Sequence, residues 1–241
     1  MELTLVEYLQ GLFSLIFVIF TVVIGIKIIL RYFVYKRREF LLIGLGWIGL
    51  ASGWIPDSIS FLMILFLNTL LSEPVYLIIA FAFLPSFVLC LLIGFTDILA
   101  TKKQKFWIIV FSIIGAIYEL IFWYLLLSPK ESAGTFLSPF QVELHLLLDI
   151  FLFIWIMCLL VIGLMFVSKS LKSDSPEMKM RGNLLLIALI AFITGAFMDT
   201  IIPLTPVTVV VTRLILTASS IIFYMGFVMP KWTKKLLLKG E

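Results

Sequence analysis

Histidine and cysteine are nearly missing from this chain, which has one histidine, His145, and two cysteines, Cys90 and Cys158. A zinc-dependent membrane hydrolase needs several histidines, and metal sites or disulfide frameworks built from cysteine need paired spacings. The composition therefore excludes both classes. We predict no metal site and no cofactor, and we expect both cysteines to be free thiols that fill apolar space.

Charged residues are also few, at 13% of the chain, and several signatures of known seven-helix proteins are missing. The last apolar stretch, 207–229, contains no lysine, so the Schiff base of a microbial-type retinal protein cannot form there. The Asp-Arg-Tyr and Asn-Pro-x-x-Tyr motifs of animal G-protein-coupled receptors are absent, as are the clustered aspartates of lipid head-group phosphotransferases. No nucleophile–base pair is visible, so we expect that the protein is not an enzyme.

Apolar residues, in contrast, are abundant and form long runs. They make up 63% of the chain, too many for an ordinary soluble domain. A helix needs about 20 apolar residues to cross a hydrocarbon core about 30 Å thick. Seven runs fit this length: 8–30, 40–57, 75–98, 106–128, 143–168, 183–202 and 207–229. We predict an all-α fold, with one seven-helix transmembrane domain over residues 1–241 and no soluble domain.

Fifteen of the eighteen Lys and Arg residues fall into four clusters between these runs. The clusters are Arg31/Lys36/Arg37/Arg38, Lys102/Lys103/Lys105, Lys169/Lys172/Lys179/Arg181 and Lys231/Lys234/Lys235/Lys239. Basic residues next to membrane spans mark the cytoplasmic side. Because an even number of crossings separates each pair of clusters, we predict a multi-pass cell-membrane protein with its N-terminus outside and its C-terminus in the cytoplasm. The net charge of +4 then reflects lipid-facing edges rather than nucleic-acid binding.

One apolar segment, 59–72, is only fourteen residues long and too short to cross the bilayer comfortably. If it were an eighth crossing, every later basic cluster would move to the outside. We therefore expect a short interfacial or re-entrant helix there, on the outer side, after Pro56 and Asp57, and we expect Asp57 and Glu73 at the outer rim. At the other end of the chain, the basic tail 231–241 is expected to continue the seventh helix or to bend along the membrane surface.

Glycine, proline and aromatic residues predict how the helices pack. Gly46, Gly49 and Gly53 share one helical face, which favours close approach of a neighbouring helix. Pro85 lies in the middle of the third run and predicts a kink there. Trp and Tyr residues near the ends of the runs are typical of the aromatic belts at membrane interfaces. They are Trp54, Tyr76, Trp123 and Tyr124 on the outer side, and Tyr32, Trp107 and Trp232 on the inner side.

Ionisable residues inside the runs lie mainly in the expected outer half. A charge at the centre of a membrane helix costs at least about 2.5–3.5 kcal/mol, so such residues face the bundle interior and have partners. Arg213 lies about six residues below the outer end of the last run, which is about 9 Å. Four further candidates lie in outer halves: Asp149, Glu119, Asp199 and His145. His145 precedes Asp149 by four residues, so the two share a helical face.

Two interpretations of these residues remain open. In the first, Arg213 forms a static ion pair with Asp199 or Asp149 that sets the helix register. In the second, Arg213, Asp149, Glu119, His145 and Asp199 surround an outward-facing ligand pocket above an apolar inner half. A further set of polar side chains in the seventh run either lines that pocket or bonds back to its own helix. The set comprises Thr212, Thr217, Ser219, Ser220 and Tyr224.

The order of segments resembles a known family, the seven-helix membrane region that precedes some prokaryotic histidine kinases. It also resembles stand-alone archaeal seven-helix proteins of unknown role. The resemblance rests on RREFLLIGLGWIGLASGW, on PVYLIIAFAFLPSFVLCLLIGFTD and on MKMRGNLLLIALIAFITGAFMDTIIPLTPVTVVVTRLILTASSIIFYMGFVMPKW. It implies a sensor. Because the sequence reaches Glu241 without a kinase domain, we expect output through a separate partner.

The leading hypothesis is therefore a receptor or sensor that binds a small anionic or amphipathic ligand from outside, with Arg213 as the anion partner. Signals would reach a cytoplasmic signalling partner, or pass within a homo-oligomer, through the basic loops and tail. The alternative hypothesis is a small-solute or proton-coupled transporter or channel, which requires a polar route through the inner half.

Overall fold

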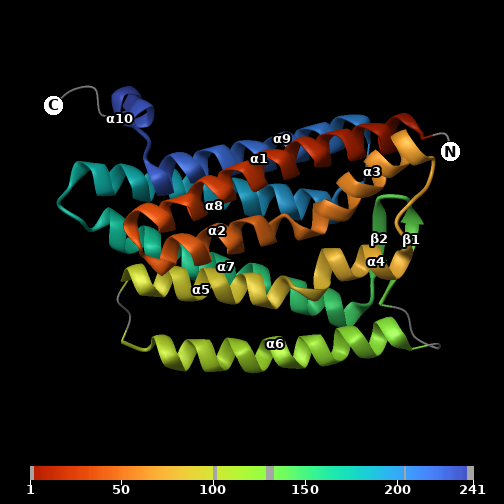
Figure 1. Cartoon of the computed structure of the whole chain (residues 1–241), viewed down its shortest axis with the longest axis horizontal. Coiled ribbons are helices and arrows are strands. Elements are labelled where there is room, and N and C mark those ends of the chain that lie inside the picture. Colours follow the sequence, from red (N-terminus) through yellow and green to blue (C-terminus); the bar gives the residue numbers. More distant parts are fainter. Residues whose placement is uncertain (1–2, 100–101, 129–132, 204, 238–241) are drawn as a thin grey trace.

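The computed structural model describes residues 3–99, 102–128, 133–203 and 205–237. Within these ranges, seven helical segments are long and apolar enough to cross a membrane, and they form one bundle with alternating directions (Figure 1). The predicted architecture of a multi-pass membrane protein is confirmed. Residues 238–241, which include Lys239 of the last basic cluster, lie outside the described residues.

Each predicted run overlaps one helical segment, although the bounds differ and several helices extend farther. The first three segments are α1 (Leu5–Tyr35), then α2 (Arg38–Leu50) with the 3-10 turn η1 (Ser52–Trp54) and α3 (Ile55–Leu67), then α4 (Glu73–Leu77) with the π-helical turn η2 (Ile78–Ala82) and α5 (Leu84–Leu99). The other four are α6 (Gln104–Leu127), α7 (Leu146–Leu171), α8 (Pro176–Ile201) and α9 (Pro206–Val228).

The bundle has two distinct ends (Figure 1). The hairpin end carries the N-terminus, the α3–α4 and α8–α9 connections and a β-hairpin. The basic end carries the α1–α2, α5–α6 and α7–α8 turns and a short last helix, α10 (Lys231–Leu237). The described residues of all four basic clusters therefore lie at one end, as their parity predicts. Which side of the membrane this end faces stays a prediction.

The second span does not end at Pro56. The 3-10 turn bends the chain and α3 restarts at Ile55, so Pro56 lies in a first helical turn, where its missing N–H is not needed. Residues 59–67 of the short apolar segment belong to α3, and 68–72 contain no helix. The segment thus continues the second span directly. Its position relative to the membrane surface stays a prediction.

The third span is distorted just before Pro85, as the proline predicts. A π-helical turn replaces the α-helix over Ile78–Ala82, because Pro85 cannot donate a backbone hydrogen bond into the preceding turn. Side chains from neighbouring helices bond to carbonyls of this turn. The Tyr118 hydroxyl donates to the Phe81 carbonyl at 3.0 Å, and the Ser52 hydroxyl donates to the Ala80 carbonyl at 2.8 Å.

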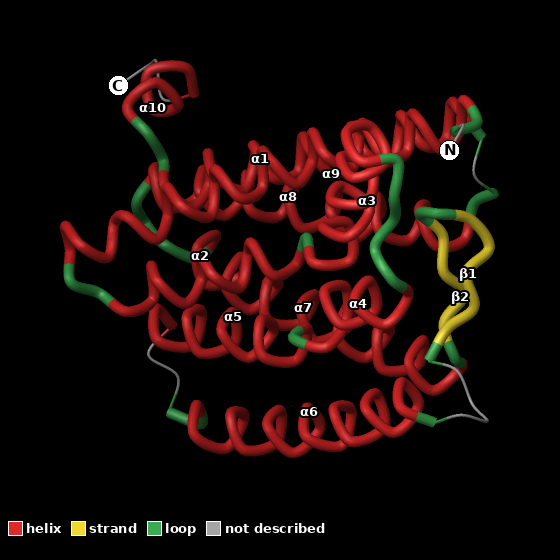
Figure 2. Tube along the Cα trace, turned by 45° about the vertical axis from the view of Figure 1, so that its right-hand side comes forward, coloured by secondary structure: helices red, strands yellow, loops and turns green. Residues whose placement is uncertain are grey.

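A β-hairpin at the hairpin end is the main element that the sequence did not predict. It consists of β1 (Gly134–Ser138) and β2 (Gln141–Leu144), which pair antiparallel. The fifth run was expected to begin at residue 143, yet α7 begins at Leu146 and the preceding residues form a strand. Phe140 at the tip is buried, and Phe136 packs edge-on against Tyr76 at 5.1 Å. The hairpin thus closes part of the bundle's end (Figure 2).

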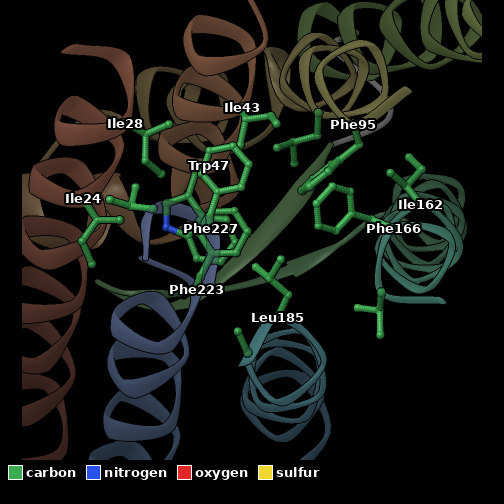
Figure 3. Close-up of a cluster of buried hydrophobic side chains, with 14 of the residues drawn as sticks. Ile24, Ile28, Ile43, Trp47, Phe95, Ile162, Phe166, Leu185, Phe223 and Phe227 are labelled. Atoms are coloured by element: carbon green, nitrogen blue, oxygen red, sulfur yellow. The ribbon is translucent and has the colours of Figure 1, made fainter. Parts of the chain in front are cut away.

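The half of the bundle toward the basic end has an apolar core (Figure 3). At its centre, the rings of Trp47 and Phe223 stack at 3.6 Å, and Phe227 continues the stack behind Phe223 at 5.7 Å. Gly46 and Gly49 let α2 approach α5 closely, since an added Cβ at either position would overlap Leu91 or Phe87. The packing role predicted for these two glycines is confirmed.

The tail does not continue the seventh helix. Met229 adopts a left-handed backbone conformation with φ of 49°, and Pro230 follows it, so α9 ends and α10 begins as a separate helix. α10 lies at one corner of the bundle beyond the end of α9, and the Lys234 ammonium donates to the Glu177 carboxylate of α8 at 2.6 Å (Figures 1 and 2). A position along the membrane surface stays a prediction.

Candidate functional site: a polar cavity at the hairpin end

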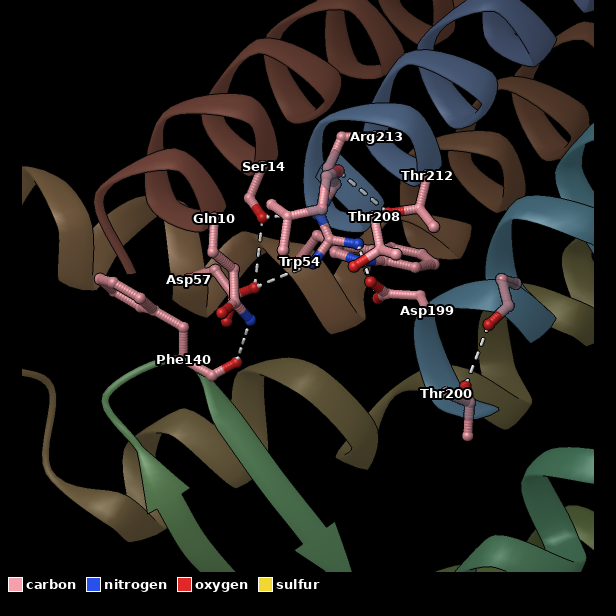
Figure 4. A network of polar contacts seen from close by, with 12 residues as sticks. Gln10, Ser14, Trp54, Asp57, Phe140, Asp199, Thr200, Thr208, Thr212 and Arg213 are labelled. Carbon is pink, nitrogen blue, oxygen red and sulfur yellow. Dashed lines mark hydrogen bonds and ion pairs between the residues drawn. The ribbon is translucent and has the colours of Figure 1, made fainter. Parts of the chain in front are cut away.

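Arg213 lies at the centre of a buried polar network and is only 1% exposed (Figure 4). Its three nitrogens face partners from three other helices. Nε donates to the Ser14 hydroxyl at 3.0 Å, Nη1 pairs with Asp199, and Nη2 lies 3.8 Å from an Asp57 oxygen. The guanidinium also lies over the Trp54 ring at 5.6 Å. Of the two ion-pair partners considered for Arg213, Asp199 is the one with which it pairs.

Asp57 is the residue that sequence reasoning misplaced. It was expected at the outer rim, but it is 2% exposed and lies in the first turn of α3, where the helix dipole favours an acidic side chain. Its carboxylate accepts hydrogen bonds from the Tyr76 hydroxyl and, at 3.2 Å, from the Ser14 hydroxyl. Because a buried charge needs such partners, Asp57 is a structural member of the network rather than a rim residue.

Two aromatic residues assigned to an interfacial belt also belong to this network. The Trp54 indole donates to Asp199 at 2.9 Å, and Tyr76 is 95% buried against Asp57. Trp123 and Tyr124, by contrast, keep exposed rings as a belt requires. Trp and Tyr have an apolar ring and one polar atom, so they suit both a membrane interface and a buried hydrogen bond. Sequence position alone does not separate the two.

Beside the network lies a cavity of about 280 Å³. Its polar walls come from α1, α3, α4, the hairpin, α7, α8 and α9. They comprise Gln10, Asp57, Tyr76, Gln141, Asp149, Asp199, Thr200 and Arg213. Apolar residues such as Leu50 and Phe192 form the other walls and separate it from a small apolar cavity of about 60 Å³ deeper in the bundle. The cavity is therefore polar on one side and apolar on the side that faces the smaller cavity.

Gly53 opens onto this cavity. It lines the wall, and a Cβ added to it would meet no atom within 4 Å. The sequence placed Gly53 in the same packing stripe as Gly46 and Gly49, but the 3-10 turn at Ser52–Trp54 rotates it away from α5. The packing role predicted for Gly53 is therefore wrong. A larger side chain at this position would extend into the cavity.

The other predicted site residues do not converge on Arg213. Asp149 lines the cavity, and its side chain is exposed in the first turn of α7. Among the described residues, the ion pairs of Arg213 are with Asp57 and Asp199 and not with Asp149. His145 caps the same helix, where its ring accepts from the Leu147 N–H at 3.3 Å. Glu119 lies on α6 outside the cavity walls and accepts from the Trp123 indole at 3.1 Å. The network therefore joins Arg213 and Asp199 but neither Glu119 nor His145.

The hydroxyls along α9 mostly bond back to their own helix. Thr212, Thr217 and Ser219 donate to backbone carbonyls three or four residues earlier, at 3.0, 2.8 and 2.6 Å. Ser220 bonds across to Thr21 of α1 at 3.0 Å. This outcome supports the second of the two uses predicted for these residues. Because these hydroxyls already have partners, they do not form a polar path from the cavity toward the basic end.

The site is acidic, because one buried carboxylate, from Asp57, and one half-buried carboxylate, from Asp199, share a single guanidinium. Asp199 keeps 17% of its side chain exposed, and Asp149 adds a further carboxylate to the walls. An arrangement of this kind accepts hydrogen bonds and attracts positive charge. Among residues 3–99, 102–128, 133–203 and 205–237, no group of three His, Cys, Asp or Glu side chains has the spacing of a metal site.

Comparison with known protein families, with curated proteins and with solved structures finds no match to this chain.

Proposed function

We propose that this protein is a receptor-like membrane protein that binds a small ligand in the cavity at its hairpin end. The observation that supports this best is a cavity of about 280 Å³ that has polar side chains on one side and adjoins an apolar region of the bundle. Its volume is near the lower end of the range of about 300–1,000 Å³ for ligand pockets. The side chains that lie between this cavity and the next one are apolar, which suits detection of a polar ligand better than its passage.

The ligand that fits is a small amphipathic compound with a positive charge or several hydrogen-bond donors. The nitrogens of Arg213 already face Ser14, Asp57 and Asp199, so this residue positions carboxylates rather than binding an anion. Asp199 and Asp149 supply the accessible charge, and Tyr76 and Phe192 supply aromatic surface for a cation. Output would pass to a cytoplasmic partner through the basic loops 31–39 and 169–182 and the tail.

Ligand-dependent melting of the purified protein tests this proposal. A ligand present at 100 times its Kd stabilises the folded state by about 2.7 kcal/mol. We expect compounds with an ammonium group and an apolar body to raise the midpoint, and we expect Gly53→Phe to abolish the rise because its ring fills the cavity. Gly53→Ala is the matched control and should keep the response. Absence of any stabilising compound, or an unchanged response in Gly53→Phe, would contradict the proposal.

A transporter is the alternative, and one observation favours it. The hairpin-end cavity shares Leu50 and Phe192 with the small apolar cavity. That cavity in turn shares Phe166 and Leu185 with a cavity of about 370 Å³ at the basic end. Three cavities thus follow one another along the bundle, with apolar constrictions between them. If the stabilising compound also crosses the membrane of proteoliposomes at a rate that Gly53→Phe lowers, the transporter proposal replaces the receptor.

The proposal includes an orientation in which the hairpin end faces outward. All four basic clusters lie at the other end, and basic flanks favour the cytoplasm. We expect an N-terminal tag to bind antibody on intact cells, and a C-terminal tag to bind it only after permeabilisation. Labelling of the C-terminal tag on intact cells would reverse the orientation and place the cavity on the cytoplasmic side.

A further inference from the structure

α6 stands at the edge of the bundle, packed against α5 and only lightly against α7 (Figure 2). A cavity of about 380 Å³ fills the space that these three helices leave. Large apolar side chains line it, among them Trp107 and Phe111 from α6 and Phe153, Met157 and Val161 from α7. Its one hydroxyl, on Thr96, already donates to the Leu92 carbonyl at 2.6 Å, so the groove offers almost no polar group to a ligand.

The groove leads to basic side chains at one end. A second, more open cavity of about 600 Å³ shares Leu99, Val161 and Met165 with it and reaches Lys169 and Lys172 at the end of α7. The Lys169 ammonium donates to the Leu99 carbonyl at 2.6 Å. In the described part of the chain, the Lys172 side chain is exposed and has no partner. The lysines that precede and begin α6, at 102, 103 and 105, lie at the same end.

The length of the groove matches one leaflet of a bilayer. From Phe153 to Met165 the groove follows α7 for twelve residues, or about 18 Å. Half of a hydrocarbon core of about 30 Å is about 15 Å. Lys169 and Lys172 lie four and seven residues beyond Met165, about 6 to 10 Å farther along the helix. An apolar chain lying in the groove would therefore place its polar head beside these two lysines.

We propose that this groove, defined by Phe153, Val161 and Met165 of α7 and the facing side of α6, binds one acyl chain of an anionic phospholipid. Lys169 and Lys172 hold the phosphate of its head group. Charge complementarity selects an anionic head, and the apolar lining selects a hydrocarbon chain. The lipid would fill the space between α6 and α7 and so attach α6 to the bundle. This inference does not depend on the proposed receptor function.

Lipid retention by the full chain tests the proposal. The protein is purified, exposed to phosphatidylglycerol or to phosphatidylcholine with the same acyl chains, and weighed by native mass spectrometry. We expect phosphatidylglycerol to be retained in preference. Lys169→Gln with Lys172→Gln should weaken its binding about 30-fold, since each lysine contributes about a fivefold gain in affinity. Lys231→Gln with Lys235→Gln removes the same charge from α10, away from the groove, and should keep the preference.

A second pair of variants locates the acyl chain. Val161 lines both cavities and is 57% exposed, so Val161→Trp should fill the groove and lose the retained lipid. Ile190→Trp, at a position on α8 that is 54% exposed, should keep it. Equal retention of the two lipids would overturn the proposal. Equal loss of phosphatidylglycerol binding in the two double lysine variants would also overturn it, because it would indicate diffuse electrostatic attraction. An oligomer that only Val161→Trp dissociates would overturn it as well, because it would indicate that a second copy of the chain occupies the groove.

Discussion

Replacing Arg213 with methionine is expected to destabilise the protein by about 3–5 kcal/mol. Methionine replaces the hydrocarbon part of the arginine side chain with an unbranched apolar chain, but it removes the only positive charge in the network. Asp57 and Asp199 would then be left in the bundle without their ion-pair partner, and Ser14 would lose its Nε donor. Loss of one member of a buried ion pair costs far more than the pair contributes, because the remaining charge stays desolvated. The midpoint of thermal or denaturant unfolding of the purified variant measures the effect.

Neutral partners provide the control for this prediction. If the loss comes from the uncompensated carboxylates, adding Asp57→Asn and Asp199→Asn to Arg213→Met should recover a large part of the stability. Asn keeps the shape of Asp and carries no charge, so the amides can still accept from Tyr76 and Trp54. If the triple variant is as unstable as the single one, packing of the arginine rather than charge balance accounts for the loss.

Gly49→Val is expected to be the second most damaging change, with a loss of about 3 kcal/mol. A Cβ at this position would lie 1.9 Å from the nearest ring atom of Phe87, so α2 and α5 would have to separate or the ring would have to leave its rotamer. Overpacking of a well-packed core typically costs about 1–3 kcal/mol, and a contact this short belongs at the upper limit. The unfolding midpoint again gives the measurement.

Gly53→Val is the matched control, because it makes the same chemical change four residues later. Its added atoms would enter the open cavity, so we expect a stability change within about 0.5 kcal/mol. Phe87→Ala in the Gly49→Val protein should restore part of the loss, since it removes the ring that the new side chain meets. Equal destabilisation by the two valines would mean that glycine flexibility, rather than close approach to α5, governs this segment.

The spans could be predicted from the sequence because each is a local feature. A run of about twenty apolar residues is enough to make a membrane helix, and the order of basic clusters then places their turns at one end of the bundle. The distortion before Pro85 and the close helix approach at Gly46 and Gly49 could be predicted because they too are local effects. A missing N–H and a missing side chain act on the residues immediately around them.

The candidate site was predictable only in part. Arg213 and Asp199 stand out as charges in apolar runs, and the cost of a lone charge in a membrane predicts an acidic partner for Arg213. The structure decided between Asp199 and Asp149. Asp57 did not stand out because it was assigned to the outer rim, and Tyr76 did not because it was assigned to the aromatic belt. The hairpin at 134–144 was missed because its alternating apolar residues adjoin an apolar helix, and hydropathy does not separate the two.

The sequence by itself therefore determined the number of spans, their order and the end of the bundle that is basic, since these depend on residues close together in the chain. Only the tertiary structure decided that Ser14, Asp57 and Asp199 surround Arg213, that Gly53 faces a cavity and that α6 leaves a groove beside α7. These features join residues up to 199 positions apart. They follow from how the helices rotate and pack against one another, which helical periodicity in a nearly uniform apolar sequence does not specify.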